Sequence, residues 1–424
     1  MANNFDSNFT REVAKVVIAG FETKRVISKN VNTQLLTGRF NPDSGENVDF
    51  KRPTDYVTKR TSTGDISGGA RSDIITGKAT GTVQDYFTID ADFNEADQAL
   101  KMGTLDRFFD NMTTRMVTDI ELDFASHMMT NCALLAGTPG TAATTWDHVA
   151  NAGAILSSTG VPMDAKWFYT VNPHTQVKLA SNQRSLGAGG TAGGLIKSAH
   201  EKAMLSENFA GMDIMTSTAL ASYTNSSVAD RAGTLTAAPT PTYLAAKDSM
   251  TQTLAVTAMG ANAVVSAGEV IQVTGRNRLN LSTRKVILDE TGANILWTAV
   301  VTADVTLGAS GEGNLVCTGP GIFEATGAYN TVDTAIGSGD VITRLGSASD
   351  IIQPNLFWHK EAFSMGSVPL QKLFSTDTIA TTKDGLQFRV SKYADGDKNK
   401  QIVRVDFRPA YATLNPFFAG HGHG

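Results

Sequence analysis

The chain has 424 residues, a formal net charge of -5 and an apolar share of 41%. That length allows two or three domains with separate hydrophobic cores, and the apolar share is well above that of disordered chains. The mildly negative charge argues against strong nucleic-acid binding, because phosphate neutralisation needs concentrated Lys and Arg.

The composition gives no sign of an oxidising or membrane location. Cys132 and Cys317 lie far apart without metal-type spacing, so we expect two reduced thiols. The first residues, MANNFDSNFTREV, lack the basic segment and apolar stretch of a secretory signal. No run approaches the ~20 apolar residues of a membrane span. We therefore expect a protein that is made and kept in the cytoplasm of its host cell.

The N-terminal segment, about residues 8–28, is predicted to form an amphipathic helix. Val13, Val16, Val17 and Phe21 recur at helical spacing, with charged residues between them. A helix this short cannot bury its apolar stripe alone. It needs a neighbour, which is either another part of this chain or another copy.

Residues 46–78 carry charges of both signs, several glycines and short β-prone pieces. This pattern predicts a long hairpin or loop that buries little of itself, and an exposed two-stranded hairpin is marginally stable alone. Two interpretations follow from the residues. The segment lies over an adjacent subunit and pairs its charges across the contact, or it is a solvated mobile loop.

Residues 105–132 carry the clearest helical pattern of the chain. Apolar residues repeat by three and four, and Arg115 can meet Asp119 at i,i+4. Thr104 is a suitable N-cap, while Gly137 and Pro139 prevent continuation. At 1.5 Å per residue such a helix is about 40 Å long, enough to form the spine of a domain.

Residues 144–215 are predicted to form an α/β region. A helix begins after Thr144 or Thr145, and KWFYTV at 166–171 is a buried strand. Asn172-Pro173 then opens a helix that runs to about Leu179. A glycine-rich loop at 187–194 precedes another helix, which contains Ala199, Ala203 and Met204.

From about residue 216 charge thins, and Thr, Ala, Val and Gly dominate. Apolar residues alternate from Ile295 to Leu307, which is strand patterning. We predict a separate antiparallel β domain at 222–347, a small barrel. Helix-and-strand character resumes at IIQPNLFWHKEAF, and the chain closes with the strands LQFRVSKYA and KQIVRVDFRPAYATL. The β domain is therefore an insertion into a parent domain.

No motif in the chain supports catalysis. Residues 187–192 fit a loose dinucleotide pattern, but the preceding NQRSL is not strand-like, and Leu195 stands where a phosphate loop needs Lys. Of seven histidines only His421 and His423 are close, in a tail GHGHG that we expect to be frayed. No nucleophile elbow, zincin helix or paired-carboxylate signature is present. We expect no catalytic residue, cofactor or metal, and no enzyme.

Several segments, spread from one end of the chain to the other, resemble the coat proteins of P22-like phages. They are FKRP at 50–53, RTSTGDISG at 60–68, ITGKATG at 75–81, VTADV at 301–305, PNLFWHK at 354–360, MGSVPLQKL at 365–373, KYADGD at 392–397 and PAY at 409–411. Each is a structural segment, and their shared order makes the match specific.

The resemblance implies an α+β fold of the HK97-like type with an inserted antiparallel β-barrel. The implied parts are an N-terminal arm at 1–35, an extended loop region at 36–83, a peripheral domain with the spine helix at 84–143, an axial α/β domain beginning at 144–221, the inserted barrel at 222–347, and the completing C-terminal strands at 348–424.

The resemblance also implies a function and partners. A major coat protein of a short-tailed double-stranded DNA phage forms pentamers and hexamers of an icosahedral shell. It assembles on a scaffolding protein, with a portal protein at one vertex, and the shell expands when DNA is packaged. Packaged DNA would lie near it without specific binding, a decoration protein is a further candidate partner, and no membrane is involved. The protein would reside in the virion capsid after assembly in the bacterial cytoplasm.

Contact residues are carried over by position. Residues 53–76 would be the extended loop over a neighbouring subunit, and a segment near 240–252 would reach a twofold-related capsomer. Another loop of the inserted domain would contact the parent domain or a neighbour, and the N-terminal arm would meet scaffold or move on maturation. The candidates are, in that order, Lys51, Arg52, Lys59, Arg60, Asp65 and Arg71; Tyr243, Lys247 and Asp248; Arg276 and Arg278; and Arg11, Lys15, Lys24 and Arg25.

Two other functions compete with a coat protein. One is a β-rich binding or adhesion module with the barrel at 222–347 as its ligand domain, which monomeric behaviour and glycan binding would favour. The other is a nucleotide-dependent enzyme using the loop at 187–194, which retained nucleotide in the purified protein would favour.

Overall fold

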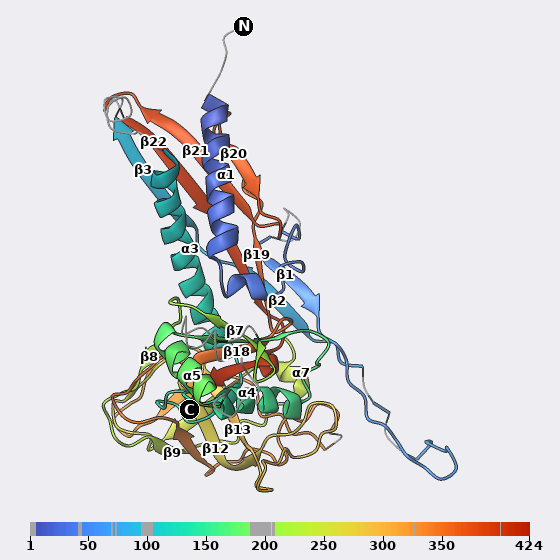
Figure 1. Cartoon of the computed structure of the whole chain (residues 1–424). Helices are drawn as coiled ribbons and strands as arrows, with labels where there is room; N and C mark the ends of the chain where they lie inside the picture. The colour runs from blue at the N-terminus through green and yellow to red at the C-terminus, as the bar shows by residue number, and fades with distance from the viewer. Residues whose placement is uncertain are drawn as a thin grey trace. The chain divides into compact units, whose positions relative to one another are not determined.

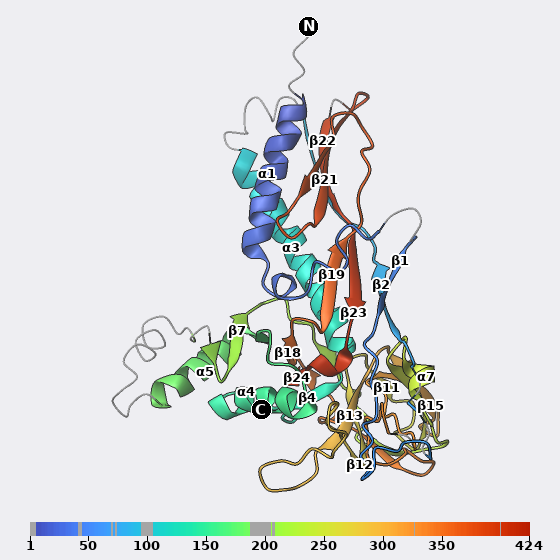
Figure 2. The same cartoon turned by 90° about the vertical axis from the view of Figure 1, so that its right-hand side faces the viewer.

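The computed structural model describes residues 6–40, 45–68, 71–72, 74–94, 105–186, 205, 208–325, 327–398 and 400–424. The chain divides into two compact units, each assembled from three separate stretches of sequence. The first unit is Met1–Asp49, Thr80–Ala125 and Phe363–Thr413. The second is Phe50–Ala79, Ser126–Ala362 and Leu414–Gly424. Figures 1 and 2 show the elements from two sides.

The first unit packs helices on antiparallel sheets. One sheet has the order β20 (Thr378–Thr381), β21 (Gln387–Asp395), β22 (Lys400–Phe407) and β3 (Phe87–Asn94). A second has the order β1 (Asn47–Lys51), β2 (Lys78–Val83), β23 (Pro409–Thr413) and β19 (Phe363–Ser367). Figure 2 shows β19 and β23 side by side, as their register from Phe363 opposite Thr413 requires.

The N-terminal helix α1 (Asp6–Lys24) lies against β20 and β21 (Figure 1). Its Phe21 ring packs edge-on against Phe388, with 4.7 Å between ring centroids, and lies 5.8 Å from that of Phe407. The hydroxyl of Thr10 donates to the carbonyl oxygen of Thr376 at 3.0 Å. The apolar stripe of α1 is therefore covered by the same chain, one of the two alternatives that the sequence left open.

The predicted spine helix is confirmed as α3 (Leu105–Thr130). Phe124 and Ile120 on its apolar face are fully buried, and the Phe124 ring lies 5.0 Å from that of Tyr411. The proposed N-cap, Thr104, lies outside the described residues.

The second unit contains a six-stranded mixed sheet with the order β4 (Leu134–Ala136), β24 (Ala419–Gly422), β18 (Asn355–His359), β5 (Trp167–Val171), β7 (Met212–Thr216) and β6 (Asn208–Phe209). The predicted buried strand at 166–171 is β5, in which every residue is buried. Helix α4 (Trp146–Thr159) contacts β4, β24 and β7.

Helix α5 (Pro173–Leu186) begins at Pro173 as expected, and the side chain of Asn172 accepts the backbone N–H of Thr175 at 2.7 Å. It continues past the expected end at Leu179, because Leu179 and Ala180 are still buried on its inner face and no breaker follows them. The glycine-rich loop at 187–194 and the helix expected around Ala199, Ala203 and Met204 lie outside the described residues.

A closed antiparallel barrel follows in the same unit. Its order is β10 (Thr251–Thr257), β15 (Gly313–Thr318), β13 (Leu296–Val301), β12 (Val270–Asn277), β16 (Val341–Arg344) and β9 (Ala232–Leu235). Side chains that are fully buried fill its interior, among them Leu254, Ile271, Trp297, Leu315 and Ile342. Closure leaves none of these six strands as an open edge. Two short ribbons accompany the barrel, β11 (Val264–Val265) with β14 (Val305–Thr306), and β8 (Tyr223–Thr224) with β17 (Ile351–Ile352).

The continuous alternation predicted from Ile295 to Leu307 is wrong in detail, because β13 ends at Val301 and β14 begins only at Val305. Between them, the Asp304 carboxylate accepts the backbone N–H of Ala267 at 2.7 Å and fixes a turn. Both faces of β13 are buried: Trp297 faces the barrel interior, whereas the hydroxyl of Thr298 on the other face donates to the carbonyl oxygen of Ala133.

The expectation of a frayed GHGHG tail is also wrong. Strand β24 lies between β4, to which it is parallel, and β18, to which it is antiparallel. His421 is 0% and His423 4% exposed. The close packing of β24 against β4 depends on glycine, because a Cβ on Gly420 would lie 2.5 Å from the carbonyl oxygen of Leu134.

Among the described helices, none combines the length and the apolar composition that crossing a bilayer requires. The described residues also hold no group of three or more His, Cys, Asp or Glu side chains placed to share a metal ion.

Candidate assembly surfaces

The extended loop, residues 53–76, exposes side chains that its own unit does not cover. Every residue from Tyr56 to Gly68 is exposed. Tyr56 is 55%, Ile66 53% and Ile74 74% exposed, although such side chains normally gain free energy from burial. These exposed apolar side chains make the described part of the loop a candidate contact surface.

The root of this loop, residues 52–55 and 75–78, is by contrast firmly held. Arg52 is buried, and its Nε donates to the carbonyl oxygen of Lys78 at 3.1 Å. Its Nη1 donates to the carbonyl oxygen of Leu414, and its backbone N–H to that of Gly77 at 2.8 Å. Burial lowers the pKa of Arg52 to about 10, with Tyr243 and Asp248 acting in the opposite direction.

A tyrosine hydroxyl bridges the two limbs of the root. The Oη of Tyr329 accepts the backbone N–H of Asp55 at 3.0 Å and contacts the carbonyl oxygen of Ile75 at 3.5 Å. The Asp55 carboxylate pairs with Arg284, whose Nη1 donates to the carbonyl oxygen of Asn330 at 2.7 Å. The outgoing limb is thus fixed to the chain beside the barrel.

The segment 243–248 holds the returning limb. Helix α7 (Tyr243–Ala246) stacks its Tyr243 ring on that of Tyr329, with centroids 3.8 Å apart and an interplanar angle of 3°. A small apolar cluster surrounds the stack, formed by Tyr243, Ala246, Ile322 and Tyr329, with Ile75, Met250 and Ala328 packed against it. Burial raises the pKa of the Tyr243 hydroxyl.

Lys247 and Asp248 lie at the rim of this cluster. Asp248 accepts the backbone N–H of Lys78 at 3.0 Å and pairs with Lys247 at 3.0 Å. The hydrogen bond from Lys247 holds the pKa of Asp248 below its usual range. Gly77 lies so close that a Cβ there would be 2.5 Å from the carbonyl oxygen of Lys247.

The predicted contact residues therefore separate into two groups. The side chains of Lys51, Lys59, Arg60, Asp65 and Arg71 are exposed, and those of Lys247 and Asp248 are 22% and 44% exposed. Arg52 and Tyr243 are buried and support the surface from inside.

Two of the candidate residues are buried and make their contacts within the subunit. Arg278 is buried and donates to the carbonyl oxygen of Ala133 at 3.1 Å and to Oγ1 of Thr298 at 2.6 Å. It joins the barrel to the parent strand region, and burial lowers its pKa to about 10. Arg25 is likewise buried, pairs with Asp384 and lies over the Phe21 ring at 4.7 Å. Both charges are engaged within the subunit by partners far along the chain.

The remaining candidates are less buried, and three of them form ion pairs within the subunit. Arg276 pairs with both carboxylate oxygens of Asp340. On the N-terminal helix, Arg11 is exposed, Lys15 pairs with Glu12, and Lys24 pairs with Asp110.

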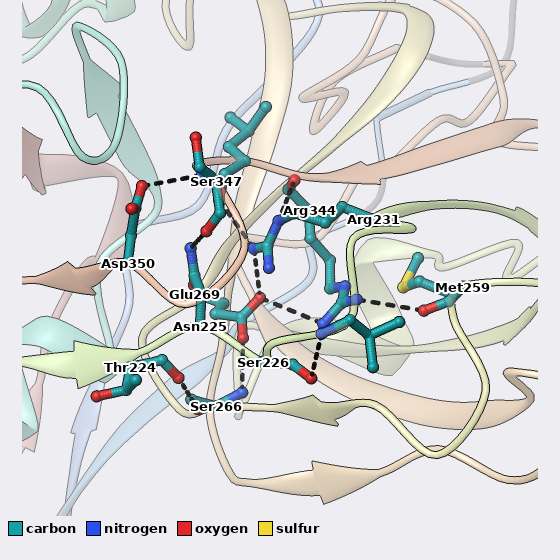
Figure 3. A network of polar contacts seen from close by, with 12 residues as sticks. Thr224, Asn225, Ser226, Arg231, Met259, Ser266, Glu269, Arg344, Ser347 and Asp350 are labelled. Carbon is teal, nitrogen blue, oxygen red and sulfur yellow. Dashed lines mark hydrogen bonds and ion pairs between the residues drawn. The ribbon is translucent and has the colours of Figure 1, made fainter.

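A buried charge network fixes the ends of the barrel (Figure 3). Glu269, 0% exposed, pairs with Arg231 at 2.9 Å, and Arg344 lies 3.8 Å away. Arg344 Nη2 donates to the carbonyl oxygens of Asp230 and Met259 at 3.0 and 3.2 Å. Arg231 stands just before β9 and Arg344 ends β16, so the network ties together the first and last strands of the barrel.

The two chain segments that lead into and out of the barrel, beside this network, are hydrogen-bonded to each other. Asn225 donates its backbone N–H to the carbonyl oxygen of Asp350 at 2.9 Å and its side-chain amide to that of Ser347 at 2.8 Å. The chain therefore enters and leaves the barrel through adjacent, hydrogen-bonded segments.

The residues that sequence reasoning missed are Asp55, Gly77, Arg284 and Tyr329. Asp55 and Tyr329 are 274 positions apart, so no local pattern brings them together. Gly77 is part of a quoted segment, but only the close approach of Lys247 shows why glycine is needed there.

Comparison with known proteins identifies the family. A family model described as P22 coat protein, gene protein 5, matches residues 1–423. The major capsid protein of Acyrthosiphon pisum secondary endosymbiont phage 1 is 36% identical over 427 residues, which covers 100% of each chain.

Among solved structures, a protein of Mycobacterium phage Che8 is similar with a TM-score of 0.48 and 13% identity, over 93% of this chain and 89% of that chain. The capsid of the cyanophage P-SCSP1u is similar with a TM-score of 0.43 and 11% identity, over 89% and 83%. The family and the full-length relative decide the assignment: the chain belongs to the P22 coat protein family of bacteriophage major capsid proteins, a structural class and not a class of enzymes.

Proposed function

We propose that this coat protein builds the icosahedral shell of a short-tailed double-stranded DNA phage as pentamers and hexamers. The match over essentially the whole chain supports this, together with an extended loop whose apolar side chains are left uncovered. Closed symmetric assembly multiplies contacts that are individually modest. Covering Tyr56, Val57 and Ile66 on a neighbouring copy would give each contact its apolar part.

We propose for the architecture the HK97-type arrangement with an inserted domain. The closed barrel, whose strands lie between Ala232 and Arg344, would be the insertion at 222–347. The other boundaries expected from the sequence, at 35, 83, 143 and 221, would separate the arm, the loop region, the peripheral domain and the first part of the axial domain. Within the family, we propose a local likeness of the quoted segments, from 50–53 to 409–411, to the coat of the Shigella phage Sf6.

For the contacts, we propose that the exposed charges of the loop, Lys51, Lys59, Arg60, Asp65 and Arg71, set the register on the neighbouring subunit. Charges at a rim select partners more than they add affinity. Lys247 and Asp248 would form ion pairs with a twofold-related capsomer. Arg276, which Asp340 holds in place on the barrel, would contact the parent domain or a neighbouring subunit.

For the partners, we propose a scaffolding protein during assembly, a portal protein at one vertex, and packaged DNA held near the shell without specific contacts. A decoration protein is a further candidate. The exposed positions Arg11 and Lys15 of α1 are the proposed scaffold-facing residues, with the arm moving when the shell expands. Assembly would take place in the host cytoplasm, and the product is the virion capsid.

The alternative of a ligand-binding barrel gains no support from the structure, because apolar side chains such as Trp297 and Leu315 fill the interior of the barrel.

The test is electron microscopy of the full chain expressed with and without its scaffolding protein. Wild-type chains are expected to form closed shells of one size. Lys247→Glu, which reverses the charge, is expected to give tubes or aberrant shells, whereas Lys247→Gln, which only removes it, should perturb assembly less. Normal shells from Lys247→Glu and from Asp248→Lys would remove both residues from the contact, and chains that never assemble would overturn the function.

A further inference from the structure

The two surfaces proposed for contact meet at one junction within the subunit. The root of the extended loop and the segment 243–248 share the Tyr243–Tyr329 stack and its apolar cluster. Ile75 from the returning limb packs against that cluster. The loop is therefore not hinged freely at its base.

The close approach of the returning limb leaves little freedom. Gly77 lies against the carbonyl oxygen of Lys247, at a separation that no residue with a Cβ would tolerate. The next residue, Lys78, donates its backbone N–H to Asp248. Two consecutive residues of the loop root thus contact two consecutive residues of the other segment.

The outgoing limb is joined to the same cluster by a single side chain. The Tyr329 hydroxyl takes the N–H of Asp55 and lies 3.5 Å from the carbonyl oxygen of Ile75, so it connects both limbs. Arg284 pairs with the Asp55 carboxylate, with 2.5 Å between Nη2 and Oδ2. A shift of Tyr329 would therefore move both limbs together.

Asp248 serves both surfaces. In the subunit its carboxylate holds Lys78 of the loop root and pairs with Lys247. If another subunit forms ion pairs with the partly exposed Lys247 and Asp248, the Asp248 carboxylate becomes less available to accept the backbone N–H of Lys78. Exposed ion pairs contribute little stability, so they are readily exchanged for a new partner.

We infer that this junction couples the two contact surfaces, so that engagement of the 243–248 segment by another copy reorients the root of the extended loop, and engagement of the loop acts back on the segment. Such coupling is reciprocal by thermodynamic linkage. The inference rests on the proposed roles of the two surfaces in assembly and adds that they do not act independently.

The first measurement uses hydrogen exchange of the purified, unassembled chain. Tyr329→Phe removes the hydroxyl bridge and keeps the ring stack. It is expected to raise exchange severalfold at residues 52–55 and 75–78 and, in the same variant, at 243–248. Tyr56→Phe is the matched control, because its hydroxyl lies on the exposed part of the loop and accepts from the neighbouring Thr54. Unchanged exchange at 243–248 in Tyr329→Phe would overturn the coupling.

The second measurement is a double-mutant cycle on assembly. Ile66→Ser alters the loop, Lys247→Gln alters the segment, and the concentration at which shells appear is measured for each variant and for the pair. Non-additive shifts of threefold or more are expected, and they should vanish in the Tyr329→Phe background. Independent sites would instead give additive shifts in both backgrounds.

The outcomes separate the two proposals. Shells that form with strictly additive shifts would contradict the coupling and leave the coat function standing. Chains that form no shells in any background would contradict the function itself, while the exchange measurement would still decide whether the junction is one unit.

Discussion

Glu121 accepts two hydrogen bonds from Ser28 through one carboxylate oxygen, from the backbone N–H at 3.0 Å and from the hydroxyl. Its other oxygen accepts the backbone N–H of Ile27 at 2.6 Å and that of Val26 at 3.3 Å. Glu121 lies on α3 and is 3% exposed. The turn after α1 is therefore fixed to the spine helix by one buried carboxylate.

Removing this carboxylate is expected to loosen the N-terminal helix. Glu121→Ala leaves several buried donors without an acceptor, which costs roughly 3 kcal/mol of unfolding free energy. The effect is measured by urea unfolding, and by hydrogen exchange at residues 26–28. Asp119→Asn on the same helix, whose exposed i,i+4 pair with Arg115 contributes little, is the control. Equal stability of both variants would contradict the assigned role of Glu121.

The buried network of the barrel should be sensitive to loss of Glu269, the carboxylate that lies against both of its buried arginines. Glu269→Gln leaves Arg231 and Arg344 buried without a countercharge, and breaking such a pair costs roughly 3–5 kcal/mol. Hydrogen exchange of β9 and β16 is expected to rise first, because the network joins these strands. Glu290→Gln makes the same chemical change at an exposed position and should have no measurable effect. A stable Glu269→Gln barrel would mean that the arginines find other partners.

Three histidines with lowered pKa values predict loss of stability in acid. Burial lowers the pKa of His127 and of His421 to about 4, and of His423 to about 3. In the unfolded chain histidine titrates near 6.5, so the unfolded state binds more protons as the pH falls below about 6.5. Stability is therefore full above that pH and declines toward the folded pKa, by about 3 kcal/mol per histidine with a folded pKa near 4.

The measurement is the unfolding free energy as a function of pH for His421→Gln. Between pH 4.5 and 6, this variant is expected to show a smaller slope of unfolding free energy against pH, and the reduction should correspond to nearly one proton fewer taken up on unfolding. His174→Gln, at an exposed position, should leave the slope as in the wild type. A slope that His421→Gln does not change would show that His421 is not buried in its neutral form.

Gly420 of β24 is expected to be needed for full stability of the second unit. Gly420→Ala places a methyl group against the backbone of β4 and the ring of Phe357, each at 2.5 Å, and overpacking of this kind costs roughly 1–3 kcal/mol. The change is measured as the denaturation midpoint of the second unit. Gly396→Ala, which meets no atom within 4 Å, should be neutral. A neutral Gly420→Ala would place the C-terminal strand elsewhere.

Local sequence patterns were enough to predict the elements whose signals lie within a few neighbouring residues. The stripe of α3, the apolar run of β5 and the Asn172-Pro173 start of α5 each depend on residues within a few positions. The GHGHG strand carries no β-propensity, and its burial depends on Leu134 and Phe357, which are distant in sequence. A tail of glycine and histidine therefore gives no signal of a central strand.

The same limit applies to the candidate contacts. Charged residues are expected at surfaces unless they are paired, and Arg25 and Arg278 found partners far along the chain, Asp384 and Ala133. The exposure of the loop from Tyr56 to Gly68 agrees with a segment that its own residues cannot bury. In the proposed assembly, what the loop covers depends on other copies of the chain.

The most direct measurement is cryo-electron microscopy of particles formed by the expressed chain. We predict a closed icosahedral shell in which Tyr56, Val57 and Ile66 of every copy lie against a neighbouring subunit. A shell that leaves this loop in solvent, or a chain that remains a monomer at every concentration with scaffolding protein present, would contradict the account.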